Sequence, residues 1–159
     1  MTMWSMMNSP LMLGLDLRRV EKGDWIHRII ANAEIIALNQ DPLGVQAKRI
    51  WSSLETECPD TAYLRDNNRV DVLAKPLSDG SVALSFINMS SVPVSDVSVD
   101  ADRIVRFIGS KMVNGDVFLK ASSYTVKDLW TGKETTVTGQ TFSVEDIEPF
   151  GNVTIRVSL

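Results

Sequence analysis

The sequence predicts a mainly β fold: an antiparallel β-sandwich over residues 46–159, preceded by a helix–strand–helix segment over residues 1–45. Two observations lead to this prediction. Before residue 45 the apolar residues follow a helical period or form a continuous run, and after it they alternate with a period of two. In the second region the alternating runs are short and are separated by turn pairs such as Asn114-Gly115 and Thr131-Gly132, which is typical of a sandwich.

The N-terminal segment is predicted to contain two helices and one buried strand. Methionines and a tryptophan in residues 3–7 lie on most of a helix surface, and a proline follows soon after. Residues 11–17 (LMLGLDL) form the continuous apolar run that is typical of a strand buried on both faces. A second helix is expected over residues 24–39, because Asp24 is a suitable N-cap and apolar residues follow at helical spacing. This order is a piece of an α/β layer.

The sandwich region is predicted to begin with a hairpin over residues 69–88, whose turn is Ser-Asp-Gly at 78–80. The segment 101–113 is compatible with either a short helix or a strand. Further strands are expected at 93–100, 124–130, 134–137, 141–146 and 152–159.

Composition excludes several classes of function. With 159 residues, 44% hydrophobic and 23% charged, the chain is an ordinary globular protein. Its net charge is −4 and its basic residues are scattered, so no nucleic-acid surface is expected. The apolar N-terminal run is too short to span a membrane and lacks the features of a signal peptide, so no membrane is expected as a partner and the compartment stays unknown. Because Cys58 is the one cysteine and there is one histidine, we expect no metal site and no cofactor.

Four blocks of sequence carry a resemblance to a known family. They are MWSMMNSPLMLGLDLR, AEIIALNQDPLGVQAKRI, VLAKPLSDGSVALSFIN and VKDLWTGKE, in this order. Together they resemble the C-terminal third of an α-galactosidase of glycoside hydrolase family 27, in the melibiase group. The resemblance implies a (β/α)8 barrel followed by an antiparallel β-sandwich. It would make residues 10–17 the last barrel strand, 24–39 the last barrel helix, and NQDPLG at 39–44 the exit into the sandwich.

The same resemblance implies that this chain carries no catalytic residue. Retaining glycosidases use two carboxyl groups about 5 Å apart. The family's nucleophile lies in a Tyr/Lys-Tyr-Asp context and its sugar-binding segment is Trp-Asn-Asp-Pro-Asp, and neither motif occurs here. We therefore expect a part of an α-galactosidase that braces the barrel and is inactive by itself, while the complete enzyme acts on α-galactosides. The alternative is a non-catalytic β-sandwich module that binds carbohydrate.

Four residues are candidates for substrate binding, each with a structural alternative. Asp16 and Arg18 follow the predicted strand on the side where a barrel holds substrate, but an ion pair that anchors the loop explains them as well. Trp51 and Trp130 could stack on a sugar ring, but lone tryptophans in small sandwiches usually belong to the core. Asp41, before a proline, is expected to fix a turn through the backbone that follows it.

Other polar residues are given structural interpretations. His27 is expected to be a surface or interface histidine, and the acidic residues Glu55, Glu57, Asp60 and Asp66 a solvated face. Triplets that fit the glycosylation pattern begin at Asn88 and Asn152 and matter only in a secretory setting.

The apolar residues of 1–45 need a partner. A strand without neighbours exposes unpaired backbone groups, and each large apolar side chain gains roughly 1.5–3 kcal/mol on burial. The segment could fold back on the sandwich, pair with a second copy of the chain, or stay mobile. We expect self-association, unless the catalytic barrel is present as the partner.

Overall fold

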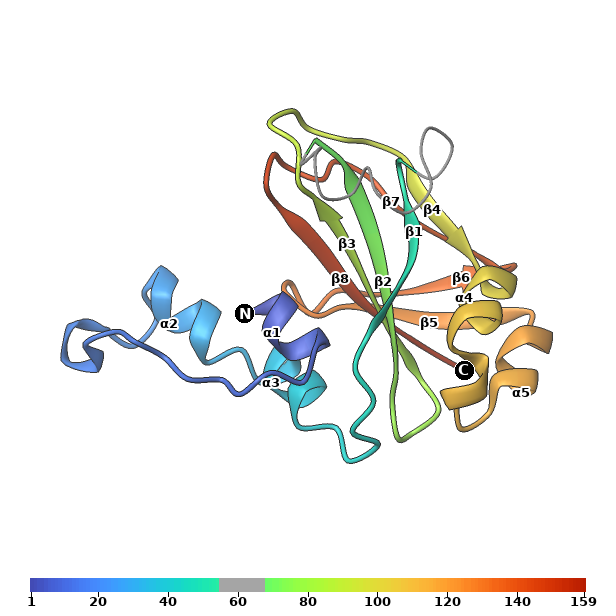
Figure 1. Cartoon of the computed structure of the whole chain (residues 1–159), viewed down its shortest axis with the longest axis horizontal. Coiled ribbons are helices and arrows are strands. Elements are labelled where there is room, and N and C mark those ends of the chain that lie inside the picture. The colour runs from blue at the N-terminus through green and yellow to red at the C-terminus, as the bar shows by residue number, and fades with distance from the viewer. Residues whose placement is uncertain (55–67) are drawn as a thin grey trace.

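The computed structural model describes residues 1–54 and 68–159 and contains one large antiparallel sheet (Figure 1). Six strands follow the order β1-β2-β3-β8-β5-β6. Their bounds are β1 Lys48–Ser52, β2 Val70–Pro76, β3 Val82–Asn88, β5 Ser123–Asp128, β6 Glu134–Thr138 and β8 Asn152–Ser158. Each neighbouring pair is antiparallel, so the predicted fold class is confirmed.

A second layer covers one face of this sheet. It contains the two-stranded sheet β4–β7 (Val97–Asp100 and Thr141–Val144), the helices α4 (Ala101–Ile108) and α5 (Gly115–Lys120), and the short 3-10 helix η3 (Gly109–Lys111). The main core lies between the layers and buries Val72, Leu84 and Val157 of the large sheet completely. It also contains three aromatic rings, Phe118, Tyr124 and Phe142, whose centroids lie 5.0–6.2 Å apart.

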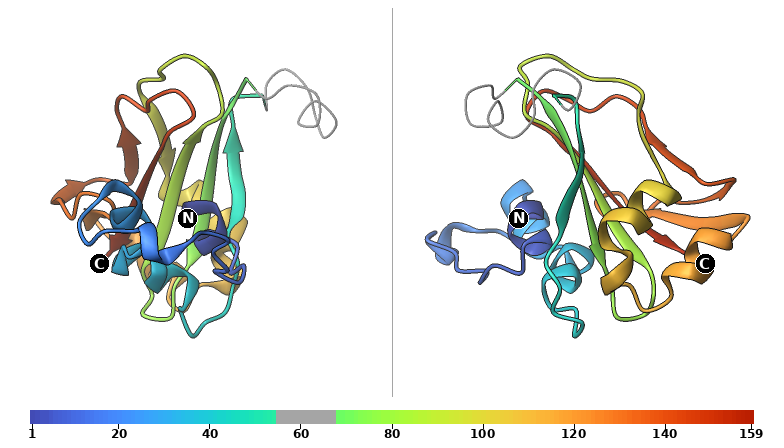
Figure 2. Two further views of the ribbon diagram at one scale, coloured as in Figure 1. Left: turned by 90° about the vertical axis from the view of Figure 1, so that its left-hand side faces the viewer. Right: turned by 45° about the vertical axis from the view of Figure 1, so that its right-hand side comes forward.

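The N-terminal segment lies against the opposite face of the large sheet (Figure 2). It contains α1 (Thr2–Met6), the 3-10 helix η1 (Leu17–Arg19), α2 (Trp25–Ile30) and α3 (Ala33–Asn39). On this face, called here the outer face, helices α1 and α3 contribute to a second core, called here the outer core, that also contains side chains of β2 and β3. Its buried members are Met6, Ile35, Leu38, Ala47, Leu73, Leu77, Ala83 and Leu129. Both faces of β2 and β3 are therefore covered.

The prediction of a strand over residues 11–17 is wrong. This stretch has no strand structure, and Met12, Leu13 and Leu17 are exposed. A strand forms only as part of a hydrogen-bonded ladder, and none of the described strands pairs with residues 11–17. The apolar run was recognised correctly, but the element it predicts needs neighbours that are absent here.

The helix expected over 24–39 is two helices. Asp24 caps α2, with its Oδ1 accepting from the His27 amide at 2.6 Å, as predicted. The chain then leaves the helix at Ala31, and Asn32 caps a new helix by accepting from the Ile35 amide at 3.1 Å. An asparagine inside a helical pattern competes for backbone donors in this way, so the break had a signal in the sequence.

The strands of the sandwich follow the prediction, with three differences. The hairpin of β2 and β3 is confirmed, but β1 was missed, and the strand expected from residue 93 begins at Val97. The segment 101–113, for which helix and strand were both left open, contains α4 and η3, and Asp100 caps α4 by accepting from the Arg103 amide. Asn114-Gly115 is not a hairpin turn: α5 begins there, and it buries Phe118.

Candidate functional site

The seam between the N-terminal segment and the sheet is held by a buried cation. Lys75 of β2 is fully buried, and its Nζ donates to Asn8 Oδ1 at 2.6 Å and to the Val45 carbonyl at 2.5 Å. Burial lowers the pKa of Lys75, and the carboxylate of Asp41 acts in the opposite direction. An unpaired buried cation is costly, so Lys75 must keep both acceptors. Asn8 lies near the start of the N-terminal segment and Val45 at its end, so the two hydrogen bonds hold both parts of the segment on the sheet.

Asp41 has the structural role that was predicted, and a further one. Its Oδ1 accepts from the Leu43 amide at 3.0 Å, which fixes the turn of NQDPLG. The same carboxylate accepts from the Ser78 amide at 3.1 Å and from the Ser78 hydroxyl at 2.9 Å. Asp41 therefore joins the exit loop to the β2–β3 turn.

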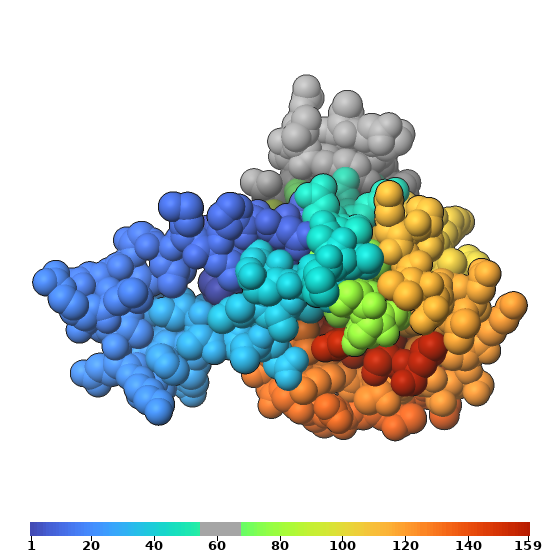
Figure 3. All heavy atoms as spheres, turned by 90° about the horizontal axis from the view of Figure 1, so that it is seen from below, coloured from blue at the N-terminus to red at the C-terminus, as the bar shows by residue number. Residues whose placement is uncertain are grey.

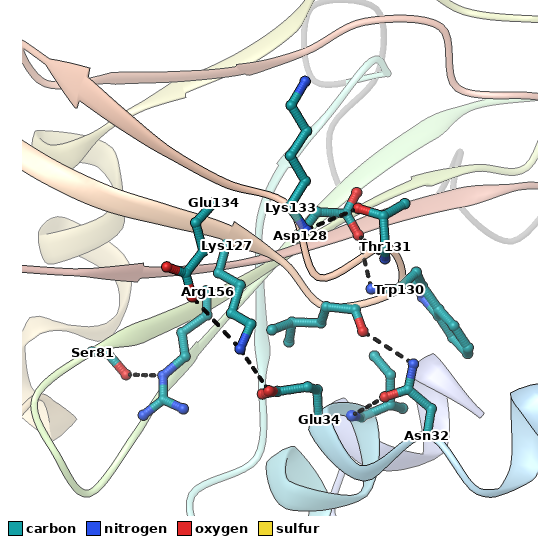
Figure 4. Close-up of polar contacts among 12 residues, drawn as sticks. Asn32, Glu34, Ser81, Lys127, Asp128, Trp130, Thr131, Lys133, Glu134 and Arg156 are labelled. Atoms are coloured by element: carbon teal, nitrogen blue, oxygen red, sulfur yellow. Dashed lines mark hydrogen bonds and ion pairs between the residues drawn. The ribbon is translucent and has the colours of Figure 1, made fainter.

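A second set of polar contacts joins α3 to the β5–β6 hairpin (Figure 4). Asn32 donates to the Leu129 carbonyl at 3.0 Å. Lys127 forms an ion pair with Glu34 at 2.7 Å and lies 3.7 Å from Glu134. The hydrogen bond that Lys127 Nζ donates to Glu34 Oε1 is the main reason that the pKa of Lys127 is raised. These residues fix α3 to the sheet.

Trp130 lies in the β5–β6 turn and is partly buried against the outer core. Its Nε1 donates to Asn152 Oδ1 at 3.2 Å, while Asp128 Oδ1 accepts from the Trp130 and Thr131 amides. A surface hollow of about 440 Å³ lies beside it, lined also by His27, Arg28, Ala31, Asn32, Glu34 and Gly132. Trp130 therefore packs as the structural interpretation predicts, while one side of it faces this hollow.

Trp51 lies elsewhere. It is partly buried on β1 and packs against the main core, on the face of the sheet opposite to the outer core that Trp130 contacts. The two tryptophans therefore do not form one site.

Asp16 and Arg18 pair with each other on the surface. Asp16 Oδ1 accepts from the Arg18 Nε at 2.9 Å and from its backbone amide at 3.1 Å, so Asp16 is the N-cap of η1. The hydrogen bond from Arg18 lowers the pKa of Asp16, and the Arg18 side chain is 89% exposed. This is the cap and ion pair of the structural interpretation. Whether these two residues or the tryptophans contact a sugar stays a prediction.

The remaining sequence predictions have mixed outcomes. Asn88 is buried, and its Nδ2 donates to the carbonyls of Val92, Ile147 and Glu148, so it cannot carry a glycan in the folded protein. Asn152 is exposed on β8. Cys58 and the acidic residues Glu55, Glu57, Asp60 and Asp66 lie outside the described residues.

Exposed apolar side chains gather on residues 1–30. This set, called here the N-terminal apolar surface, consists of Met3, Trp4, Met7, Met12, Leu13, Leu17, Trp25 and Ile29. Part of it extends from the sandwich as a protrusion (Figure 3). An exposed apolar group of this size next to a well-packed domain is typical of a protein interface.

The seam and the N-terminal apolar surface therefore form a candidate interface. In residues 1–54 and 68–159 no group of three or more His, Cys, Asp or Glu side chains could hold a metal ion. No helix within the same residues is long and apolar enough to cross a membrane. Lys75, Asn8 and Glu34 were not recognised from the sequence, whereas the caps Asp24 and Asn32 and the turn residue Asp41 had a local signal there.

Comparisons with known proteins agree on one family. The family model described as the α-galactosidase C-terminal β-sandwich domain matches residues 67–157. An α-galactosidase from Cyamopsis tetragonoloba is 32% identical over 138 residues, which cover 79% of this chain and 30% of that protein. α-Galactosidase A from Cellvibrio japonicus is 28% identical and aligns with 99% of this chain and 34% of its own length. The chain thus spans about a third of these curated relatives, or less.

Solved structures show the same fold. α-Galactosidase I from Mortierella vinacea superposes on 98% of this chain with a TM-score of 0.73 at 22% identity, and 33% of that chain is covered. The α-galactosidase of Saccharomyces cerevisiae superposes on 98% of this chain with a TM-score of 0.71 at 18% identity, over 41% of its own chain. At these identities the likeness concerns the fold, and it includes the N-terminal segment.

Proposed function

Because the chain belongs to the family of α-galactosidase C-terminal β-sandwich domains, we propose that it is the non-catalytic C-terminal part of a family 27 glycosidase and braces the catalytic barrel of that enzyme. Its relatives named α-galactosidase extend well beyond the aligned third, and the family's catalytic motifs are absent from this sequence. The proposed substrate of the complete enzyme is an α-galactoside, and the proposed partner of this chain is the barrel.

One observation carries the bracing role. The N-terminal apolar surface stays exposed while α1 and α3 of the same segment are fixed to the sheet by Lys75, Asn32 and Glu34. A segment that is bound firmly on one side and apolar on the other can transmit the position of the sandwich to whatever covers it. We propose a domain boundary near residue 45, with 1–45 as the part that belongs structurally to the barrel and 46–159 as the sandwich.

Two measurements test this function. The chain by itself should give no turnover of a chromogenic α-galactoside above a buffer blank, because the mechanism needs two carboxyl groups and neither family motif is present. Turnover that a substitution in this chain abolishes would contradict the proposal. The genomic sequence directly upstream of the Met1 codon should encode an in-frame barrel, and the longer product should be active. A longer product that is inactive on α-galactosides would also contradict it.

A second function, carbohydrate binding without cleavage, is favoured only by the hollow beside Trp130. Titration with melibiose, followed by the NMR signal of the Trp130 indole, tests it, with Trp51 as the internal control. A saturable shift at Trp130 alone that disappears in Trp130→Ala would support binding. Equal shifts at both tryptophans, or none, would exclude it.

A further inference from the structure

The two edges of the large sheet differ in how they are protected. Among the described residues, β1 forms one edge and β6 the other, and each pairs with a single neighbouring strand (Figure 1). The β1 strand contains two cationic residues, and its pairing with β2 is irregular between Arg49 and Trp51. Arg103 of α4 also donates to the Ile50 carbonyl at 2.5 Å. Charge, irregular pairing and a covering helix all keep an exposed edge from pairing with another chain.

The β6 edge has neither cations nor an irregular pairing. The strand Glu134–Thr138 (ETTVT) contains no proline, lysine or arginine, and its register with β5 runs without a shift. Four of its five residues are β-branched, the type favoured in strands, and its side chains are mostly exposed. A regular, exposed edge of this kind is a template for a further strand.

The pairing with β5 shows which backbone groups β6 presents at its free edge. Hydrogen-bonded pairs alternate with non-bonded pairs along an antiparallel ladder. At one end the Asp128 amide donates to the Lys133 carbonyl at 2.8 Å, and at the other the Gly139 amide donates to the Ser122 carbonyl at 2.9 Å. Both ends therefore indicate that the odd-numbered residues of β6 bond to β5. The even-numbered residues turn their N–H and C=O groups outward.

The three outward-facing residues, Glu134, Thr136 and Thr138, are complementary to themselves. Within the described residues, their backbone N–H and C=O groups have no hydrogen-bond partner. Two β6 strands can pair antiparallel with a two-fold axis at Thr136. This pairing places Thr136 opposite its own copy and Glu134 opposite Thr138 of the second chain, so every outward-facing group is bonded.

The charges favour the same register. With Glu134 opposite Thr138, the two glutamates lie at opposite ends of the paired strands. A shift that places Glu134 opposite its own copy would bring two carboxylates together, which is unfavourable. Glu134 keeps Lys127 of its own chain at 3.7 Å, and threonine opposite threonine is a favourable cross-strand pair. A second copy of this chain thus matches the edge in both backbone pattern and charge.

We propose that the β6 edge is a dimer interface, at which two copies of this chain pair antiparallel through Glu134–Thr138 with Thr136 at the two-fold axis. The large sheet then continues from one copy into the other. A pair of five-residue strands is a small contact, so the dimer is weak and reversible. This interface is separate from the N-terminal apolar surface and does not rest on the proposed function.

Charge variants of the full chain test the two-fold register. Thr136→Lys and Thr136→Glu each place like charges opposite one another, so either variant alone should dimerise about fivefold more weakly than the native chain in sedimentation equilibrium. In an equimolar mixture, mixed dimers should form at least as tightly as native dimers, because lysine then faces glutamate. Thr125→Lys is the matched control and should dimerise like the native chain. Thr125 is exposed and lies beside Thr136 on the same face, but on β5.

Amide hydrogen exchange of the native chain tests which backbone groups the dimer covers. Exchange at the amides of Glu134, Thr136 and Thr138 should slow as the protein concentration rises, in proportion to the fraction of dimer. The amides of Thr135 and Val137 bond to β5 and should exchange slowly at every concentration. This measurement needs no substitution, so it decides even if a charge variant does not fold.

Four outcomes would overturn the proposal. The native chain could stay monomeric at high concentration, or the mixture of the two charge variants could associate no better than either alone. Exchange at the three outward-facing amides could be independent of concentration. The dimer could also persist in Thr136→Lys but be lost in the double variant Met12→Gln and Trp25→Gln, which would assign it to the N-terminal apolar surface. None of these results depends on glycosidase activity, so the proposed function and this inference can fail separately.

Discussion

The sandwich interior and the N-terminal segment are both rich in apolar residues, but they bury them to different extents. In the main core Phe118, Phe142 and Val157 are 0–1% exposed, whereas Met12, Leu17 and Trp25 of the segment are 63–80% exposed. The difference lies in the neighbours and not in the composition. The strands of the large sheet pair with one another and are covered by a second layer, while the apolar side chains of the N-terminal segment are buried only where α1 and α3 meet the sheet.

The helices of the N-terminal segment and its residues 11–17 differ in how their backbone groups are satisfied. Its helices satisfy their own backbone groups, so α1, α2 and α3 form, and two of them cover the outer face of the sheet. A strand cannot satisfy its own backbone groups, so residues 11–17 form none. Of the three outcomes considered for this segment, the structure shows α1 and α3 folded back on the sheet. Self-association through the side chains that stay exposed is still a prediction.

The largest expected effect is a difference in stability between two variants, each with one side chain truncated in one of the two regions. Phe142→Ala should lower the free energy of unfolding by about 3–5 kcal/mol, because it leaves a cavity beside Phe118 and Tyr124. Leu17→Ala, at a side chain that is 63% exposed, should change it by less than about 0.5 kcal/mol. Urea unfolding measures both. Similar losses in the two variants would show that the segment is as well packed as the core.

Removal of the whole segment should have the next largest effect. A chain of residues 46–159 should still unfold cooperatively, because it retains the main core. Its free energy of unfolding should fall by about 2 kcal/mol, since Leu73, Leu77 and Leu129 lose their cover while 45 residues no longer have to be ordered. Thermal unfolding and an NMR spectrum decide. A disordered shortened chain would contradict the boundary at residue 45.

The buried cation of the seam gives a pH-dependent difference. Because burial lowers the pKa of Lys75, the unfolded chain binds more protons than the folded chain between this lowered pKa and the ordinary value of 10.5. The stability of the native chain relative to Lys75→Met should therefore rise as the pH increases toward 10.5. Urea unfolding of both proteins at pH 7 and pH 10 measures this. A relative fall would contradict the burial of a charged Lys75.

The smallest effect on stability is expected on the N-terminal apolar surface. The double variant Met12→Gln and Trp25→Gln should change the free energy of unfolding by less than about 0.5 kcal/mol, because both side chains are exposed. We expect the native chain to self-associate, so that its mass in light scattering rises with concentration. In the double variant this rise should be smaller. Val113→Gln, at an exposed side chain outside this surface, is the matched control. A native chain that stays monomeric at high concentration would exclude self-association.

Local sequence signals predicted individual elements well. Alternation and the Ser-Asp-Gly turn predicted the β2–β3 hairpin, and Asp24 predicted the start of α2. Asp41 was correctly predicted to fix the turn that follows it in the chain. These features depend on residues within a few positions of one another. Elements whose conformation depends on distant neighbours were missed or wrong, as at β1 and residues 11–17.

The sequence by itself determined the fold class, the family and the absence of the family's catalytic motifs, because each is written in periodicity or in contiguous motifs. Only the tertiary structure decided that Lys75 and Asp71, which alternate on β2 like residues of a solvated face, are buried beneath the N-terminal segment. It also decided which apolar residues stay exposed. The physical reason is that burial and hydrogen-bond satisfaction depend on what covers a face, and the covering helices lie tens of residues away along the chain.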